Sequence, residues 1–206
     1  MKKTDKPGIA VFDFDGTLIN RDSLPYFLLY TFGWTQFMIR LPLIILLKTA
    51  SVAGLISTQR AKEKLFISFV RGMKQTDFTA ACHRFATRIP AWVYPDALQE
   101  IKKHQKEGNE LLIISASIPE WIRPWAETIG IPDVEGTEME CKDGRLTGRF
   151  STPNCKGEEK VHRLRTRFPD FAERTLYVYG DSSGDRELLA LADYPHYKPF
   201  RKNKQV

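Results

Sequence analysis

The sequence has few cysteines and histidines, and neither type is spaced as a metal site or a redox pair. Cys82, Cys141 and Cys155 form no C-x-x-C pair, so neither a structural zinc site nor a dithiol redox centre is expected. The start, MKKTDKPG, is basic, but no long apolar segment follows it because Asp13 and Asp15 interrupt the next hydrophobic run. The sequence therefore predicts a reduced, cytoplasmic protein without a secretion signal.

An uninterrupted apolar run of about 20 residues, the length that crosses a bilayer, is also lacking. The nearest approach is the segment 23–59, in which Arg40 and Lys48 are the two charged residues among many leucines, isoleucines and aromatic residues. Because these charges, with Pro25 and Pro42, divide the segment, we do not expect it to span a membrane. It is predicted to be the apolar part of a helical insertion.

Internal repeats, low-complexity segments and nucleic-acid-binding motifs are absent as well. Lys and Arg number 31 against 25 Asp and Glu, which gives a formal net charge of +6. This excess suits an anionic partner, but no motif indicates nucleic acid, so we expect none to bind. The basic clusters near the two ends are expected to be solvated. They comprise Lys2, Lys3, Lys6, Lys198, Arg201, Lys202 and Lys204.

Short apolar segments alternate with longer amphipathic ones. The apolar runs at 9–14, 110–115 and 175–180 are typical of buried parallel strands. Helices are predicted between and after them, over 96–108, 119–130 and 158–168. The Asp143-Gly144 pair also predicts a hairpin within 138–150.

This alternation predicts an α/β fold with a doubly wound, Rossmann-like parallel sheet. The apolar segment 23–59 interrupts this alternation of strands and helices after the first strand. We therefore expect residues 1–19 and 93–206 to form the α/β core, and residues 20–92 to form a helical cap inserted after the first strand.

Polar side chains follow each predicted strand. Asp13 and Asp15 close the first strand, Ser115 closes the second, and Asp181 and Asp185 follow the third. In an open parallel sheet, ligands bind beyond the carboxyl ends of the strands. Four carboxylates at one edge should share protons or hold a cation, and an oxygen-only ligand set favours Mg²⁺. The sequence thus predicts a magnesium site and phosphoryl chemistry.

The two-residue spacing of Asp13 and Asp15 suits a covalent route. On an extended strand both side chains would point to the same side. One carboxylate can attack phosphorus, and the other can protonate the leaving oxygen and later activate water. The alternative is that these aspartates, with Ser115, cap helices and turns. Ser117 is interpreted as an ordinary loop hydroxyl and is left out of the catalytic set.

Four segments resemble, in order, the motifs of the haloacid dehalogenase superfamily: DFDGTL at 13–18, Ser115 after LLII, a lysine at 156–160, and GDSSGDREL at 180–188. The resemblance covers most of the chain. It implies a doubly wound sheet, a Mg²⁺ cofactor and hydrolysis of phosphate esters.

By position, the resemblance makes Asp13 the nucleophile, Asp15 the general acid/base and Ser115 the phosphate-binding hydroxyl. It makes Asp181 a metal ligand and Asp185 a supporting member of the metal site, with the backbone carbonyl of Asp15 also facing the metal.

The motif lysine is ambiguous. Lys160 begins a K-x-x-x-L pattern that places Leu164 on the buried face of a helix, and we favour it over Lys156. Lys156 is then placed with Ala116 and Asp22 among the substrate-binding residues.

The position of the insertion is similar to the branch that contains phosphoserine phosphatase and the C-type phosphatidylglycerophosphatases. Phosphoserine phosphatases carry a glutamate nine positions after the nucleophile, for the substrate ammonium, where this chain has Asp22. They usually carry an asparagine where this chain has Gly184. Both departures disfavour phosphoserine as the substrate.

Three functions stay open. The preferred one is a phosphatase of a lipid phosphate such as phosphatidylglycerol phosphate, with the apolar cap in peripheral contact with the inner face of the membrane. A phosphatase of a small soluble metabolite such as phosphoserine is the first alternative, in which the same apolar residues pack inside the cap. A non-catalytic lipid- or partner-binding protein on this scaffold is the second.

Overall fold

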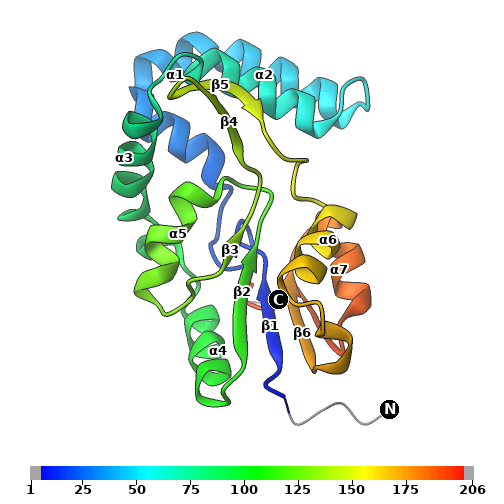
Figure 1. Ribbon diagram of the computed structural model, residues 1–206. Coiled ribbons are helices and arrows are strands. Elements are labelled where there is room, and N and C mark those ends of the chain that lie inside the picture. Colours follow the sequence, from blue (N-terminus) through cyan, green and yellow to red (C-terminus); the bar gives the residue numbers. More distant parts are fainter. Residues whose placement is uncertain (1–5, 202–206) are drawn as a thin grey trace, which may run out of the picture.

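A computed structural model describes residues 6–201 of the chain, and its centre is a five-stranded parallel sheet (Figure 1). The strand order is β3-β2-β1-β6-β7. The strands are β1 (Ile9–Phe12), β2 (Glu110–Ile114), β3 (Val134–Glu135), β6 (Leu176–Gly180) and β7 (Tyr194–Tyr197). Ile9 of β1 pairs with Glu110 on one side and Leu176 on the other. All of β1 is buried, because a central parallel strand is covered on both faces.

Helices cover both faces of this sheet. On one face, α4 (Pro95–Lys106) and α5 (Pro119–Thr128) pack against Ala10 and Phe12 of β1. On the other, α6 (Glu158–Arg167) and α7 (Arg186–Leu191) pack against Ile9 and Val11. Alternate residues of one strand thus serve two separate apolar cores. The predicted doubly wound α/β fold is confirmed.

A helical insertion lies between β1 and α4, at the carboxyl end of the sheet (Figure 1). It consists of α1 (Ser23–Val52), α2 (Thr58–Val70), α3 (Gln75–Ala86) and a short 3₁₀ turn, η1 (Ile89–Trp92). The predicted hairpin is present as β4 (Met139–Lys142) and β5 (Arg145–Phe150). At Gly148, whose φ is +82°, a Cβ would lie 2.5 Å from Ile67 Cα, so the hairpin can approach α2 this closely only with glycine.

Helix α1 corrects one expectation. Pro25 and Pro42 were expected to divide the apolar segment, but the helix runs through both and is bent at Gly33, where φ is +78°. Pro25 is tolerated because it lies in the first turn, where its missing N–H has no intrahelical partner. Among the described residues, α1 is the one helix long and apolar enough to cross a membrane, on length and composition alone.

The two edge strands of the sheet, β3 and β7, were not predicted from the sequence. Strand β3 has two residues and β7 has the sequence YPHY, so neither carries an apolar run that could mark it as a strand. The remaining 3₁₀ turns are η2 (Phe171–Glu173) and η3 (Ser183–Asp185). The three cysteines form no disulfide. The predicted solvated lysines Lys2, Lys3, Lys202 and Lys204 lie outside the described residues.

Candidate active site

The polar ends of β1, β2 and β6 surround a cavity of about 420 Å³. Most of the residues singled out from the sequence line it. They are Asp13, Asp15, Asp22, Ser115, Ala116, Lys156, Lys160 and Asp181. Asp185 does not line the cavity, because it is 1% exposed and lies beneath the others.

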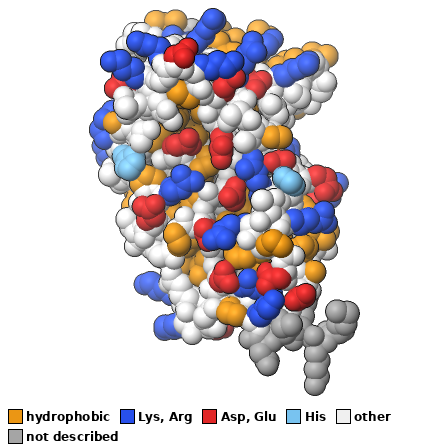
Figure 2. Space-filling view, in the orientation of Figure 1, with side chains coloured by type: hydrophobic (Ala, Val, Ile, Leu, Met, Phe, Trp, Pro, Cys, Tyr) orange, Lys and Arg blue, Asp and Glu red, His pale blue; other side chains and the backbone are white. Residues whose placement is uncertain are grey.

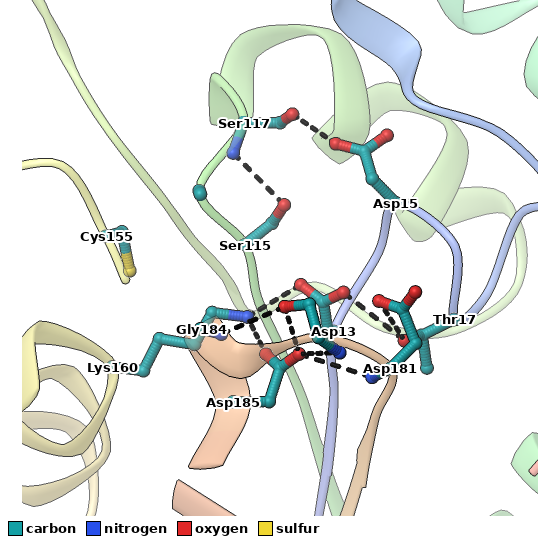
Figure 3. Close-up of polar contacts among 12 residues, drawn as sticks. Asp13, Asp15, Thr17, Ser115, Ser117, Cys155, Lys160, Asp181, Gly184 and Asp185 are labelled. Atoms are coloured by element: carbon teal, nitrogen blue, oxygen red, sulfur yellow. Dashed lines mark hydrogen bonds and ion pairs between the residues drawn. The ribbon is translucent and has the colours of Figure 1, made fainter. Parts of the chain in front are cut away.

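The chain turns sharply after β1. Phe14 O accepts hydrogen bonds from the N–H groups of Thr17, Leu18 and Ile19, at 3.3, 2.9 and 3.1 Å. Gly16 has a φ of +77°, and a Cβ there would lie 2.5 Å from Asp181 Oδ2, so the turn requires glycine. The expectation that Asp13 and Asp15 share one extended strand is therefore wrong: β1 ends at Phe12, and the two side chains enter different parts of the site (Figure 3).

Asp13 belongs to a buried cluster of carboxylates around Lys160 (Figure 3). Lys160 Nζ donates to Asp13 Oδ1 and to Asp185 Oδ1, each at 2.6 Å. The other carboxylate oxygen of Asp185 accepts from the backbone N–H groups of Asp181 and Ser182, at 3.2 and 2.9 Å. Oxygen atoms of Asp13, Asp181 and Asp185 all lie within 4.8 Å of one another.

The charges of this cluster are unbalanced. Three carboxylates face two positive charges, the buried ammonium of Lys160 and the guanidinium of Arg201, which contacts Asp181. Burial raises the pKa of Asp13 to about 7, although Lys160 opposes the shift. Burial alone would lower the pKa of Lys160, but Asp13 and Asp185 outweigh it and raise the pKa. A cluster with surplus negative charge and only oxygen donors fits a hard divalent cation such as Mg²⁺.

Asp15 turns toward the helical insertion (Figure 3). Ser23 N, at the start of α1, donates to Asp15 Oδ1 at 2.7 Å, and the Ser117 hydroxyl donates to Asp15 Oδ2. Trp121 Nε1 donates to Ser23 Oγ at 3.2 Å and so fixes this end of α1. Burial, followed by the nearby carboxylate of Asp22, raises the pKa of Asp15 to about 6. Ser117, left out of the predicted catalytic set, therefore orients Asp15.

The remaining predicted residues lie around the cavity in different settings. Ser115 is 1% exposed, and its Oγ accepts a hydrogen bond from Ser117 N at 3.1 Å. Asp22 caps α1 through a hydrogen bond from Leu24 N to Oδ1, at 3.1 Å. Lys156 is exposed, and its side chain lies over Gly184. In the structure it is thus Lys160, and not Lys156, that donates a hydrogen bond to Asp13.

Among the basic residues that line the cavity, Lys62 and Arg201 are two that the sequence did not single out for it. Lys62 of α2 donates from Nζ to Ala116 O at 2.9 Å and to Asn154 Oδ1 at 3.2 Å. Arg201 was expected to be solvated, but it contacts the Asp181 carboxylate and donates to Gly16 O at 3.3 Å. No local pattern marks either residue, because Lys62 lies in an amphipathic helix and Arg201 lies in a basic terminal cluster.

Comparison with known proteins shows similarity to one family over most of the chain. The model of the family described as haloacid dehalogenase-like hydrolase matches residues 10–190. Protein CicA of Caulobacter vibrioides is 34% identical over 203 residues, covering 95% of this chain and 88% of that protein. Histidinol-phosphatase of Neisseria meningitidis serogroup C is 29% identical over 212 residues, covering 91% and 88%.

Solved structures share the fold. A protein of unknown function from Bordetella pertussis Tohama I aligns with a TM-score of 0.74 and 21% identity, over 90% of this chain and 87% of that one. A substrate-bound phosphoserine phosphatase aligns with a TM-score of 0.64 and 16% identity, over 92% and 84%. At these identities the likeness shows the fold and leaves the substrate open.

Proposed function

The chain belongs to the haloacid dehalogenase-like hydrolase family, and we propose that it is a Mg²⁺-dependent phosphomonoester hydrolase that works through an aspartyl-phosphate on Asp13. The observation that carries this proposal is the cluster of Asp13, Asp181 and Asp185 around Lys160 at the carboxyl end of the sheet. Under this proposal residues 1–19 and 93–206 are the catalytic core, and residues 20–92 are the cap.

The proposed roles follow from the positions of the side chains. The Asp13 carboxylate attacks phosphorus, and Lys160 offsets the charge of the nucleophile and of the phosphoryl group. Asp15 protonates the leaving oxygen and then takes a proton from the water that hydrolyses the acyl phosphate. Its raised pKa of about 6 keeps part of the population protonated near neutral pH. Ser115 and the Ala116 backbone hold the phosphoryl oxygens.

The residues present fit a metal at this site. Asp13, Asp181 and the backbone carbonyl of Asp15 would hold Mg²⁺. Asp185 supports them through Lys160 and the backbone N–H of Asp181. A bound Mg²⁺ supplies positive charge that neutralises the phosphoryl oxygens during transfer.

Metal removal tests this proposal. We expect an excess of chelator to abolish hydrolysis of p-nitrophenyl phosphate and added Mg²⁺ to restore it. Calorimetry with Mg²⁺ alone should show binding to the chain, and Asp181→Asn should weaken it because one ligand charge is lost. Undiminished hydrolysis in excess chelator would contradict the mechanism.

The substrate we propose is a lipid phosphate resembling phosphatidylglycerol phosphate. Helix α1 supports this choice, because several of its large apolar side chains are exposed, among them Trp34 at 66%, Ile39 at 66% and Leu46 at 64%. Figure 2 shows hydrophobic and basic side chains side by side at the end of the molecule that α1 and α2 form. Such a surface suits peripheral contact with anionic lipid, at the inner face of the membrane.

Vesicle binding distinguishes this substrate from a small metabolite. We expect the chain to co-sediment with vesicles that contain anionic phosphatidylglycerol, and the double variant Ile39→Ser, Leu46→Ser to bind at least about tenfold more weakly, since two apolar side chains no longer enter the interface. Leu191→Ser is the matched control, because Leu191 is exposed on the core, away from α1.

The opposite result favours the alternative. If no vesicle binding is found, and kcat/KM is higher for phosphoserine or histidinol phosphate than for any lipid phosphate, the substrate is a small metabolite. The relative named histidinol-phosphatase and the structural likeness to phosphoserine phosphatase support including these two esters.

A further inference from the structure

A second cavity, the hairpin cavity, lies between helix α2 and the hairpin β4–β5, which runs along α2 at the cap end of the molecule (Figure 1). Its volume is about 390 Å³. It shares no lining residue with the active-site cavity. A ligand of the hairpin cavity is therefore bound separately from the reacting phosphate ester.

The lining of the hairpin cavity is basic. Its charged residues are Arg71, Lys142, Arg145, Arg149 and Glu140. The single carboxylate, that of Glu140, is already engaged, because Lys142 Nζ lies 3.1 Å from its Oε1 and Thr147 Oγ1 donates to its Oε2 at 2.6 Å. Within the described residues 6–201, no salt bridge joins Arg71, Arg145 or Arg149 to a carboxylate. Three guanidinium groups thus surround the cavity without a salt-bridge partner.

The hairpin holds these like charges close together. Lys142 lies directly opposite Arg145 in the register of the two strands. Arg145, Thr147 and Arg149 alternate along β5 with buried residues, so their side chains share one face of the strand. Like charges directly opposite one another in a sheet are destabilising. An anion placed among them would offset this repulsion.

Backbone hydrogen bonds fix the walls of the hairpin cavity. Gly72 N, just after α2, donates to Leu146 O at 2.8 Å, and Leu146 N donates to Met73 O at 2.9 Å. The side chain of Arg145 is also held, because its Nη1 donates to Gly72 O at 2.7 Å. A guanidinium has five N–H donors, so most of those of Arg145 remain for a ligand. The fold has already ordered this part of the cavity, which lowers the cost of binding.

The side-chain chemistry indicates which anion fits. The planar guanidinium presents two parallel N–H groups that match two oxygens of a phosphate. Isolated arginines are ordinary on a protein surface, but here three line one cavity whose single carboxylate is engaged by other residues.

We propose that the hairpin cavity is a binding site for a phosphate group, separate from the active site, in which Arg71, Arg145 and Arg149 bind the phosphate oxygens. The phosphate group comes either from a lipid headgroup or from a free phosphate. This inference goes beyond the proposed hydrolysis and does not depend on it.

Protein freed of metal ions by dialysis separates this site from the active site. Without Mg²⁺, the carboxylates of Asp13, Asp181 and Asp185 carry surplus negative charge and repel an anion. The first arm of the experiment is calorimetry with inorganic phosphate. The second is co-sedimentation with phosphatidylcholine vesicles that contain phosphatidic acid, whose headgroup is a phosphomonoester.

In at least one arm the native protein should bind, and the double variant Arg71→Gln, Arg149→Gln should bind at least about tenfold more weakly, because charge-assisted hydrogen bonds are lost. Both side chains are exposed, so the fold should persist, which thermal unfolding checks. The double variant Arg71→Lys, Arg149→Lys keeps the charge and should retain part of the binding.

The matched control is the double variant Arg84→Gln, Arg88→Gln. It removes the same charge from two exposed arginines of the cap, in and just after α3, and should bind as the native protein does. A loss as large as that of Arg71→Gln, Arg149→Gln would show diffuse attraction to surface charge and overturn the inference.

The arm that responds identifies the source of the phosphate group. A response to inorganic phosphate alone identifies free phosphate, a response to vesicles alone identifies a lipid headgroup, and a response in both shows that the site accepts either. The inference is overturned if the native protein binds in neither arm, or if Arg71→Gln, Arg149→Gln binds as tightly as the native protein in both. Hydrolysis of p-nitrophenyl phosphate tests the proposed function separately.

Discussion

Asp13→Asn is expected to abolish turnover and to leave no phosphoenzyme, whereas Asp15→Asn should lower turnover by about 10²–10⁴ and still form one. The amide at position 13 keeps the shape of the side chain but is not a nucleophile. The amide at position 15 cannot donate or accept the proton. Because an aryl phosphate has a good leaving group, its first step depends less on Asp15 than the hydrolysis of the intermediate does.

Acid-quench experiments with p-nitrophenyl phosphate and Mg²⁺ check this difference. Mass spectrometry of the quenched protein should find a phosphoryl group on the Asp15→Asn variant, on the peptide that contains Asp13, and none on Asp13→Asn. Ser183→Ala is a suitable control, because Ser183 does not line the cavity. Near-normal turnover by Asp13→Asn would exclude covalent catalysis at this residue.

Lys160→Ala should reduce turnover by on the order of 10²–10³, the range found when one electrostatic stabiliser of a transition state is removed. Lys160 Nζ lies 2.6 Å from Asp13 Oδ1, so its charge acts directly on the proposed nucleophile. Lys156→Ala should reduce turnover less, because Lys156 is exposed and has no part in the Asp13–Asp185 cluster.

Stability must be measured beside turnover for this pair of variants. Removing Lys160 leaves two buried carboxylates without their common partner, and breaking such a pair costs about 3–5 kcal/mol of folding stability. Denaturant unfolding therefore accompanies the kinetics. Lys160→Arg keeps the charge and should recover part of both losses. A larger loss of turnover from Lys156→Ala than from Lys160→Ala would transfer the role of motif lysine to Lys156.

The sequence by itself determined the architecture and the edge of the sheet at which the site lies. The apolar runs that became β1, β2 and β6 could be recognised because buried parallel strands are apolar on both faces. Since parallel strands end at one edge, the polar residues after these runs had to meet. Asp13, Ser115 and Asp181 do line one cavity.

The tertiary structure decided which contacts those side chains make. A periodicity of two cannot show that β1 ends at Phe12, nor that Asp15 is then held by Ser23 and Ser117, because that depends on where α1 begins and where the segment after β2 passes. The choice between Lys156 and Lys160 likewise needed the position of α6 beside Asp185.

No local sequence pattern could predict the contacts between residues far apart in the chain. Lys62 and Ala116 are 54 positions apart, and Arg201 and Gly16 are 185 apart. For Lys62 the sequence predicted only that it lies in the helical insertion, residues 20–92. The packing of cap on core decided that this lysine enters the cavity. The amino-acid sequence sets which charges the chain has, but their distances, and hence their chemistry, exist only once the core and the insertion have folded.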